Sequence, residues 1–215
     1  QLPSIAPGQV LYDLIETKQI ECVFLKHIFR QQAKSGIISI SHAIRHDELH
    51  ALEEIDNYQD IHFMPCKEQD VIRFVSKIIQ KAVDEGYDFY DFQVLSPMYQ
   101  GAAGVDAINE ALQNLLNPKA ENKPEVRIYQ HIFREGDKVL QLKNRPDDNV
   151  FNGDIGIIIE IKKKDGFYYQ QDKIFVDFEG DIVEYTSQDF NQLTLAYCMS
   201  IHKAQGSEFK IVVMP

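Results

Sequence analysis

The chain has 215 residues, of which 44% are apolar and 26% are charged, and this length allows one or two domains with hydrophobic cores. The formal net charge of −11 argues against a module that binds nucleic acid through bulk positive charge, because phosphate contacts need Lys and Arg. No run of about 18 apolar residues occurs, so we expect no membrane span. The three cysteines form no CxxC pair, which favours buried apolar thiols in a reducing cytoplasm over a disulfide framework or a zinc site.

The first 130 residues alternate between helical spacing and short apolar runs. Helical patterns are expected at 10–15, 31–55, 68–86 and 104–116. Short apolar runs that could be buried strands lie at 22–25, 61–64 and 92–95. Strands that alternate with helices predict an α/β fold with a parallel sheet covered on both faces.

The pattern changes from about Glu135 to Phe190, where helical spacing disappears. Short β-rich runs are separated by the turn signals Asn152-Gly153, Asp165-Gly166 and Glu179-Gly180, which predicts a small antiparallel barrel. The expected strands of this barrel include 138–142, 155–161, 173–178 and 181–185. The runs 193–201 and 211–214 then return to the strand-and-helix pattern of the first half, so the barrel is expected to be an insertion in the α/β domain.

The most informative stretch is Ser200–Phe209, which follows the strand-like run Leu195–Met199. Ligands of open α/β sheets bind at the carboxyl ends of strands, so polar groups placed there are candidates for contact. The stretch resembles motif V of superfamily 1 helicases, and its Gln-Gly-Ser-Glu form is similar to the RecD-like enzymes, the exodeoxyribonuclease V alpha-subunit family. The resemblance implies DNA contacts from Ser200, His202 and Lys203, and ATP contacts from Gly206 and Glu208. Taken alone, the stretch also fits a helix N-terminus with a capping Ser200 and a solvated Lys203.

Two further segments match the same family on the DNA side. Ser96-Pro97-Met98-Tyr99 follows an expected strand, and the resemblance implies that this segment meets the DNA strand, where Tyr99 could stack on a base. The family often has a basic residue where this chain has Gln100, and Tyr99 also fits a half-buried aromatic at the edge of a core. The stretches 136–144 and 149–156 resemble the entry into an SH3-like barrel, with Asn144 and Asn152 as DNA candidates. Asn152-Gly153 is in any case a hairpin signal.

Two segments near the start match family motifs that sense the nucleotide. Gln1–Gly8 resembles the end of motif III, and Leu25–Gln32 resembles motif IV. The resemblance implies that Gln1 and Arg30 report the γ-phosphate of ATP, a task that suits the forked guanidinium of arginine. Arg30 also fits an ordinary surface position on a helix.

The resemblance implies a division into domains. Residues 1–32 would end a first RecA-like motor domain, 33–133 and 191–215 would form a second, and 134–190 would be an inserted SH3-like β-barrel. No G-x-x-x-x-G-K-[ST] motif occurs in the 215 residues. We therefore expect a C-terminal part of an ATP-dependent helicase of DNA repair or recombination, inactive alone, with ATP and Mg²⁺ held mainly by other residues and single-stranded DNA as the partner.

Two other functions are compatible with the residues alone. The first is a non-catalytic α/β module whose SH3-like insert docks a protein partner, which the acidic charge favours. The second is a nucleotide-binding enzyme unrelated to DNA. The seven histidines show no H-x-x-H or HExxH spacing, so no metal site is expected from them.

Overall fold

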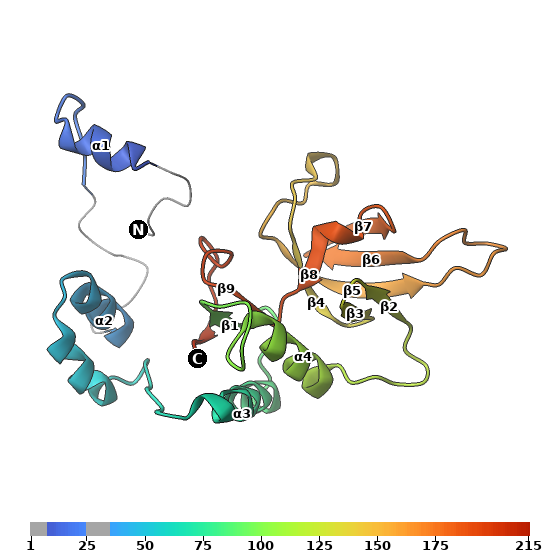
Figure 1. Ribbon diagram of the computed structural model, residues 1–215, viewed down its shortest axis with the longest axis horizontal. Coiled ribbons are helices and arrows are strands. Elements are labelled where there is room, and N and C mark those ends of the chain that lie inside the picture. The colour runs from blue at the N-terminus through green and yellow to red at the C-terminus, as the bar shows by residue number, and fades with distance from the viewer. Residues whose placement is uncertain (1–7, 25–34) are drawn as a thin grey trace. The chain divides into compact units, whose positions relative to one another are not determined.

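The computed structural model describes residues 8–24 and 35–215, and the chain divides into two compact units, Gln1–Pro65 and Cys66–Pro215. Figure 1 shows the helices and strands of both. In the described residues, no helix has both the length and the apolar character needed to cross a membrane. The second unit holds all the β-sheets of the described chain.

The first unit is helical. It contains α1 (Val10–Glu16), α2 (Gly36–Arg45) and a 3-10 helix (Leu49–Asn57). The start of α2 is anchored by Asp60, whose carboxylate accepts hydrogen bonds from the Gly36 N–H at 2.9 Å and the Ser35 hydroxyl at 2.6 Å. The helical patterns expected here are confirmed in part, because α2 buries Ile40 and Ala43 whereas α1 buries no residue.

The strand expected at 61–64 is wrong, and so is the strand at 22–25 as far as the chain is described. Residues 61–64 are not paired with any strand, and the Phe63 side chain is 66% exposed. Residues 22–24 are likewise exposed and unpaired, and Leu25 lies outside the described residues. An apolar run forms a strand only where a neighbour satisfies its backbone groups, and the described part of this unit offers no such neighbour.

The second unit begins with the predicted α/β layer. Its parallel sheet has the order β10-β1-β9, and β1 pairs in parallel with both neighbours. Helices α3 and α4 pack against each other and against this sheet, and the apolar face of α3 is buried as its spacing predicts. Gly86 follows α3 with φ +88°, the left-handed conformation that commonly ends a helix. The bounds are α3 (Val71–Asp84), β1 (Phe92–Ser96), α4 (Val105–Leu116), β9 (Cys198–Ser200) and β10 (Ile211–Val213).

A five-stranded antiparallel sheet, of order β7-β6-β5-β4-β8, confirms the predicted β-rich segment, except that its edge strand β8 lies beyond the expected end of that segment at Phe190. Its edge strands β7 and β8 are not paired with each other, so in the described chain the strand ladder does not close into a complete barrel. At Gly156 of β5 a Cβ atom would lie 2.6 Å from Val176 Cγ1, so only glycine fits there. A short hairpin, β2–β3, precedes the sheet. The bounds are β2 (Glu125–Ile128), β3 (His131–Arg134), β4 (Lys138–Gln141), β5 (Ile155–Lys162), β6 (Lys173–Phe178), β7 (Asp181–Thr186) and β8 (Leu193–Leu195).

The run Leu195–Met199, expected as one strand, belongs to two strands in different sheets. Leu195 ends β8, which is antiparallel to β4, whereas Cys198 starts β9, which is parallel to β1. The chain therefore passes from the barrel to the parallel sheet across Ala196 and Tyr197, both fully buried.

A buried amide explains this break. The Asn109 side chain of α4 accepts a hydrogen bond from the Cys198 N–H at 2.8 Å, and it donates to the Cys198 carbonyl at 2.8 Å and the Leu195 carbonyl at 3.4 Å. These bonds satisfy backbone groups that a continuous ladder would otherwise have paired.

The cysteines differ from the expectation of three buried thiols. Cys198 is buried, but Cys22 and Cys66 are exposed, and all three are free. Burial raises the pKa of the Cys198 thiol to about 12, so this thiol stays protonated at neutral pH.

Candidate functional site

The carboxyl ends of β1 and β9 lie side by side. Ser96 and Ser200 are register partners and the last residues of their strands. Tyr99 follows β1, and its hydroxyl lies 3.4 Å from Ser200 Oγ, so the segments after both strands meet at one edge of the sheet. The structure thus brings together the two stretches that the sequence singles out for contact with DNA.

The loop after β1 is held rigidly and presents its tip to solvent. The Ser96 hydroxyl is buried, donates to the Ala103 carbonyl at 2.7 Å and accepts from the Met98 N–H at 3.2 Å. At Gly104 a Cβ atom would lie 2.6 Å from the Tyr99 carbonyl oxygen, so the turn requires glycine. Ser96 therefore shapes the loop, and the exposed side chains are those of Pro97, Met98, Tyr99 and Gln100.

The segment after β9 is a series of turns. The Ser200 carbonyl accepts from the N–H groups of Lys203 at 3.0 Å and Ala204 at 3.2 Å, and no helix follows in the described chain, so the capping alternative does not hold. His202 is exposed. The Lys203 side chain is half-buried, which lowers the pKa of its ammonium, and this ammonium forms no hydrogen bond or ion pair with any of the described residues.

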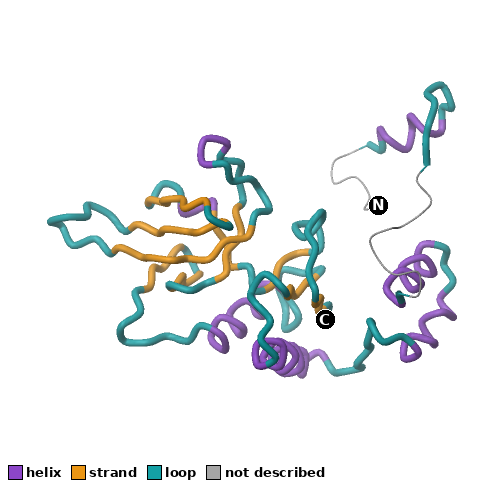
Figure 2. Tube along the Cα trace, turned by 180° about the vertical axis from the view of Figure 1, so that it is seen from behind, coloured by secondary structure: helices purple, strands orange, loops and turns teal. Residues whose placement is uncertain are grey.

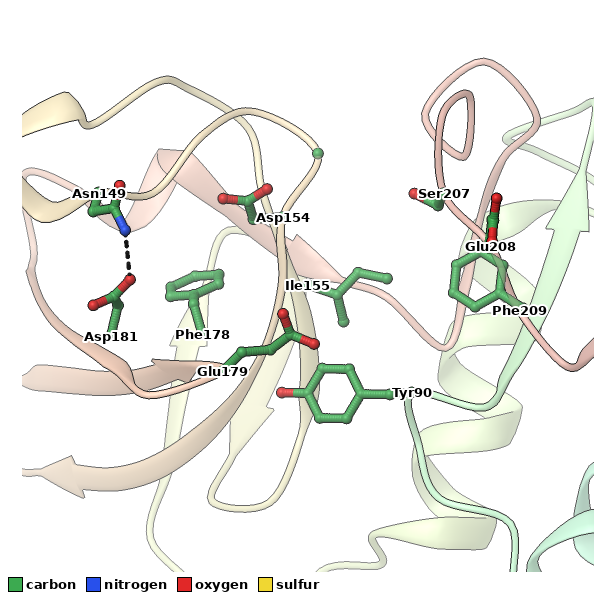
Figure 3. Close-up of a pocket in the computed structure, with 11 residues that line it drawn as sticks. Tyr90, Asn149, Asp154, Ile155, Phe178, Glu179, Asp181, Ser207, Glu208 and Phe209 are labelled. Carbon is green, nitrogen blue, oxygen red and sulfur yellow. Dashed lines mark hydrogen bonds between the residues drawn. The ribbon is translucent and has the colours of Figure 1, made fainter. Parts of the chain in front are cut away.

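Gly206 and Glu208, the ATP candidates, lead into an acidic cleft of about 560 Å³. Gly206 adopts φ +93°, a left-handed turn that favours glycine. Figure 3 shows Ser207, Glu208 and Phe209 on one side of the cleft and barrel residues on the other, with the Tyr90 hydroxyl directed toward Glu179. The carboxylates that line it are Asp154, Glu179, Asp181 and Glu208.

This cleft does not fit the phosphate end of ATP. The described residues that line it include no Lys or Arg, and its carboxylates would repel a triphosphate. A carboxylate such as Glu208 is chemically suited to accept hydrogen bonds from ribose hydroxyls, but nothing described holds the phosphates or a Mg²⁺ ion. Gln1 and Arg30, the candidates for sensing the γ-phosphate, lie outside the described residues.

The two asparagine candidates of the barrel contact each other. Asn144 Oδ1 accepts from the Asn152 N–H at 2.9 Å, and both side chains are exposed. Gly153 has φ +105°, and the Asp154 N–H donates to the Phe151 carbonyl at 3.1 Å, which gives the predicted turn at Asn152-Gly153. Asn144 therefore stabilises this turn, whatever else it binds.

The stretch that begins at Gly136 has a role that the sequence did not reveal. Asp137 and Lys138 are both fully buried, on opposite sides of the start of β4. The Asp137 carboxylate accepts from Gln113 and Asn117 of the α4 region, both at 2.6 Å, and from the Tyr197 hydroxyl at 3.0 Å. Burial raises the pKa of Asp137 despite these donors.

Lys138 binds the parallel sheet. Its Nζ donates to the carbonyls of Phe89 at 2.6 Å and Phe92 at 2.9 Å, and to Gln93 Oε1 at 3.0 Å. Gln93 in turn donates to the Ala196 carbonyl at 3.1 Å. Burial lowers the pKa of Lys138 to about 7. Asp137 and Lys138 thus connect the barrel to α4 and β1, and the only sequence signal was two charged residues at the start of an apolar strand.

Comparisons with known proteins agree with this architecture. Residues 108–178 match the family described as the ATP-dependent RecD-like DNA helicase SH3 domain. The chain is 32% identical over 99% of its length to the ATP-dependent RecD2 DNA helicase of Deinococcus radiodurans, of which it covers 27%. It is 25% identical over 87% of its length to the RecBCD enzyme subunit RecD of Buchnera aphidicola, of which it covers 33%.

A solved structure supports the fold. The chain resembles a structure described as showing DNA unwinding at forked dsDNA by two coordinating Pif1 helicases, with a TM-score of 0.50 and 18% identity. The match covers 87% of this chain and 42% of the other. The chain thus spans about a quarter to a third of the curated relatives it matches.

Proposed function

We propose that this chain is part of a RecD-like superfamily 1 helicase, to whose relatives it is similar over nearly its whole length, and that it binds single-stranded DNA at the edge where β1 and β9 end, within an enzyme that hydrolyses ATP to unwind duplex DNA. The names of the relatives mention ATP and DNA. The geometry of this chain suggests which of its surfaces would bind the DNA strand. We further propose a cytoplasmic role in DNA repair or recombination, in line with the RecD name of its relatives.

One observation carries the DNA part of this proposal. The register pair Ser96 and Ser200, with the Tyr99 hydroxyl 3.4 Å from Ser200 Oγ, brings two exposed loops to one edge of the parallel sheet. Tyr99 is 51% exposed there and offers an aromatic face, and Lys203 offers an ammonium without a partner in the described part of the chain. Stacking on an aromatic ring and a few cationic contacts suit binding that does not depend on base sequence.

The ATP part of the proposal depends on residues beyond those described. We propose that Gln1 and Arg30 sense the γ-phosphate and that Gly206 and Glu208 lie toward the ribose. The acidic cleft beside Glu208 makes a phosphate contact there unfavourable, so the phosphates and Mg²⁺ would be held by other residues of the enzyme. When bound, ATP supplies the free energy for movement along DNA.

The test is substitution of Tyr99 in the full-length protein. Tyr99→Ala should weaken binding of a fluorescein-labelled thymidine oligonucleotide roughly tenfold, because a base–aromatic stack contributes about 1–3 kcal/mol. Tyr99→Phe keeps the ring and loses only the long hydrogen bond to Ser200, so its affinity should stay within about threefold of the wild type. Equal losses in both variants, or no loss in Tyr99→Ala, would show that Tyr99 does not stack on DNA.

A parallel measurement tests the nucleotide side. Arg30→Ala in the full-length protein should abolish most of the DNA-stimulated ATPase activity while leaving oligonucleotide affinity without nucleotide unchanged. Normal ATP hydrolysis in this variant would contradict the proposed role of Arg30. ATP hydrolysis by the wild type that single-stranded DNA does not stimulate would instead favour a nucleotide-binding enzyme unrelated to DNA.

The alternative is a non-catalytic module whose SH3-like part docks a protein, and the acidic cleft at the edge of the barrel supports it. A cleft lined by four carboxylates suits a basic peptide better than a phosphate backbone. If the full-length protein neither binds the oligonucleotide nor hydrolyses ATP, this alternative replaces the helicase proposal. If Asp181→Lys retains oligonucleotide binding and DNA-stimulated ATP hydrolysis, the carboxylate of Asp181 in this cleft is needed for neither.

A further inference from the structure

The loop between β5 and β6 carries two large aromatic side chains that nothing in the described chain covers. Residues 163–172 form this loop, which projects away from the rest of the barrel in both views (Figures 1 and 2). Phe167 is 82% exposed and Tyr168 is 79% exposed. Two adjacent exposed aromatic rings offer apolar surface whose burial against a ligand is favourable.

Hydrogen bonds from the backbone order the turn that carries these rings. Asp165 Oδ1 accepts hydrogen bonds from the N–H groups of Phe167 at 2.9 Å, Tyr168 at 2.8 Å and Tyr169 at 2.8 Å. These donors lower the pKa of the Asp165 carboxyl, so the turn stays closed at neutral pH. The two exposed rings meet edge to face, with centroids 5.0 Å apart at 75°. Binding of a ligand to either ring therefore costs little conformational entropy for ordering the loop backbone.

The loop has no net charge, because Lys163 and Lys164 are balanced by Asp165 and Asp172, but its lysines gather on the side that leads into the tip. Three consecutive lysines, Lys162–Lys164, lead into the tip. Lys162 pairs with Glu160 at 3.2 Å and Lys163 pairs with Asp172 at 2.8 Å. The Lys164 side chain is exposed, and among the described residues its ammonium forms no hydrogen bond or close ion pair, although the Asp172 carboxylate attracts it. A cation is thus available three residues before the first exposed ring.

We propose that this loop is a second single-stranded DNA contact, in which Phe167 and Tyr168 stack on bases and Lys164 lies against a phosphate. The inference rests on the proposed DNA-binding function and adds a site at a loop remote in sequence from the strand ends of the parallel sheet. Exposed aromatic faces beside lysines are the pattern of sequence-independent single-strand binding. A protein partner is less well matched, because the exposed apolar surface is limited to two side chains at a narrow tip.

The experiment uses the absence of tryptophan from the 215-residue chain. Phe167→Trp introduces a single indole at the tip, and a stacked base should quench its fluorescence as an unlabelled thymidine oligonucleotide is added. Binding by the same protein is followed in parallel with the anisotropy of a fluorescein-labelled oligonucleotide. The matched control is Phe63→Trp, an exposed aromatic position of the first unit, whose fluorescence should stay unchanged.

Two further variants measure the contribution of the tip. Phe167→Ala combined with Tyr168→Ala should weaken oligonucleotide binding roughly tenfold, and Lys164→Gln should weaken it about two- to threefold at low salt. Circular dichroism of each variant should match the wild type, since neither ring is buried.

The outcomes separate this inference from the proposed function. Saturable quenching of Phe167→Trp at the concentrations where anisotropy rises supports the second contact. An anisotropy rise without quenching, together with unchanged affinity of the double alanine variant, contradicts the loop contact and leaves the strand-end site intact. No anisotropy change with any protein contradicts both.

Discussion

Lys138 shows how a single residue can join two sheets. Its ammonium is fully buried and donates to three acceptors of the β1 region, two of which are backbone carbonyls. Lys138→Met keeps the length of the side chain but leaves these acceptors unpaired, so the free energy of unfolding should fall by about 3 kcal/mol. Urea denaturation at pH 8 measures this change. The control is Lys164→Met, which removes an exposed ammonium and should alter stability by less than about 0.5 kcal/mol.

The same residue predicts a pH dependence of stability. Burial lowers the pKa of Lys138 to about 7, whereas the ordinary value in an unfolded chain is 10.5. Between these two values the unfolded chain binds a proton that the folded chain lacks, so the free energy of unfolding rises with pH. Below about pH 7 both states carry the proton, so the pH dependence ends there and the cost of burying the charged ammonium has its full size.

The measurement is a series of denaturation curves from pH 7 to pH 9, below the range in which tyrosines ionise. The wild type should gain stability across this range, and the slope should disappear in Lys138→Met. An unchanged slope in the variant would show that Lys138 stays charged in the folded protein.

At the scale of elements, the passage from β8 to β9 depends on Asn109. Its side chain forms three hydrogen bonds to the backbone of Leu195 and Cys198 and is itself buried. Asn109→Ala should destabilise the chain by about 2–3 kcal/mol, because it leaves a buried N–H and a buried carbonyl unpaired. It should also weaken oligonucleotide binding, since Ser200 lies two residues after Cys198, whose backbone Asn109 holds in place. Glu110→Ala, at an exposed position of the same helix, should change neither quantity.

Much of the secondary structure was predictable because periodicity reports burial directly. Helices α3 and α4 and strands β1 and β4–β7 lie where their patterns place them. The break inside Leu195–Met199 was not predictable, because the run contains no turn residue and is apolar throughout. What divides it is a pair of buried amides, Asn109 and Gln93, that come from distant parts of the sequence. Conversely, Phe63 and Met64 looked like strand residues but found no partner strand in the described chain.

The candidate site was predictable to a similar degree. Motif resemblance selected the two loops that follow β1 and β9, and topology explains why they meet. The sequence could not show that Ser96 is buried, or that Asn144 and Asn152 bond each other. These depend on side-chain direction, which loop sequences specify weakly. Residues Phe167 and Tyr168 matched no motif and became noticeable only through their exposure.

At the scale of the whole molecule, the net charge of −11 sets how DNA must be bound. A strongly acidic protein gains little from long-range attraction, so affinity has to come from stacking and a few local cations. We propose Lys203 and Lys164 as those cations, and Tyr99, Phe167 and Tyr168 as the stacking groups. The salt dependence of binding distinguishes this arrangement from a basic groove.

For single strands, the slope of log K against log salt concentration is about −0.7 for each phosphate neutralised, so two lysines predict a slope of about −1 to −2. Anisotropy titrations of the 215-residue chain between about 50 and 200 mM salt measure this slope. Lys203→Gln should make it shallower by about 0.7, because one ion pair is lost, whereas Tyr99→Ala should lower the affinity without changing it. A slope steeper than about −5 would mean that many more basic groups contact the phosphates than the two proposed.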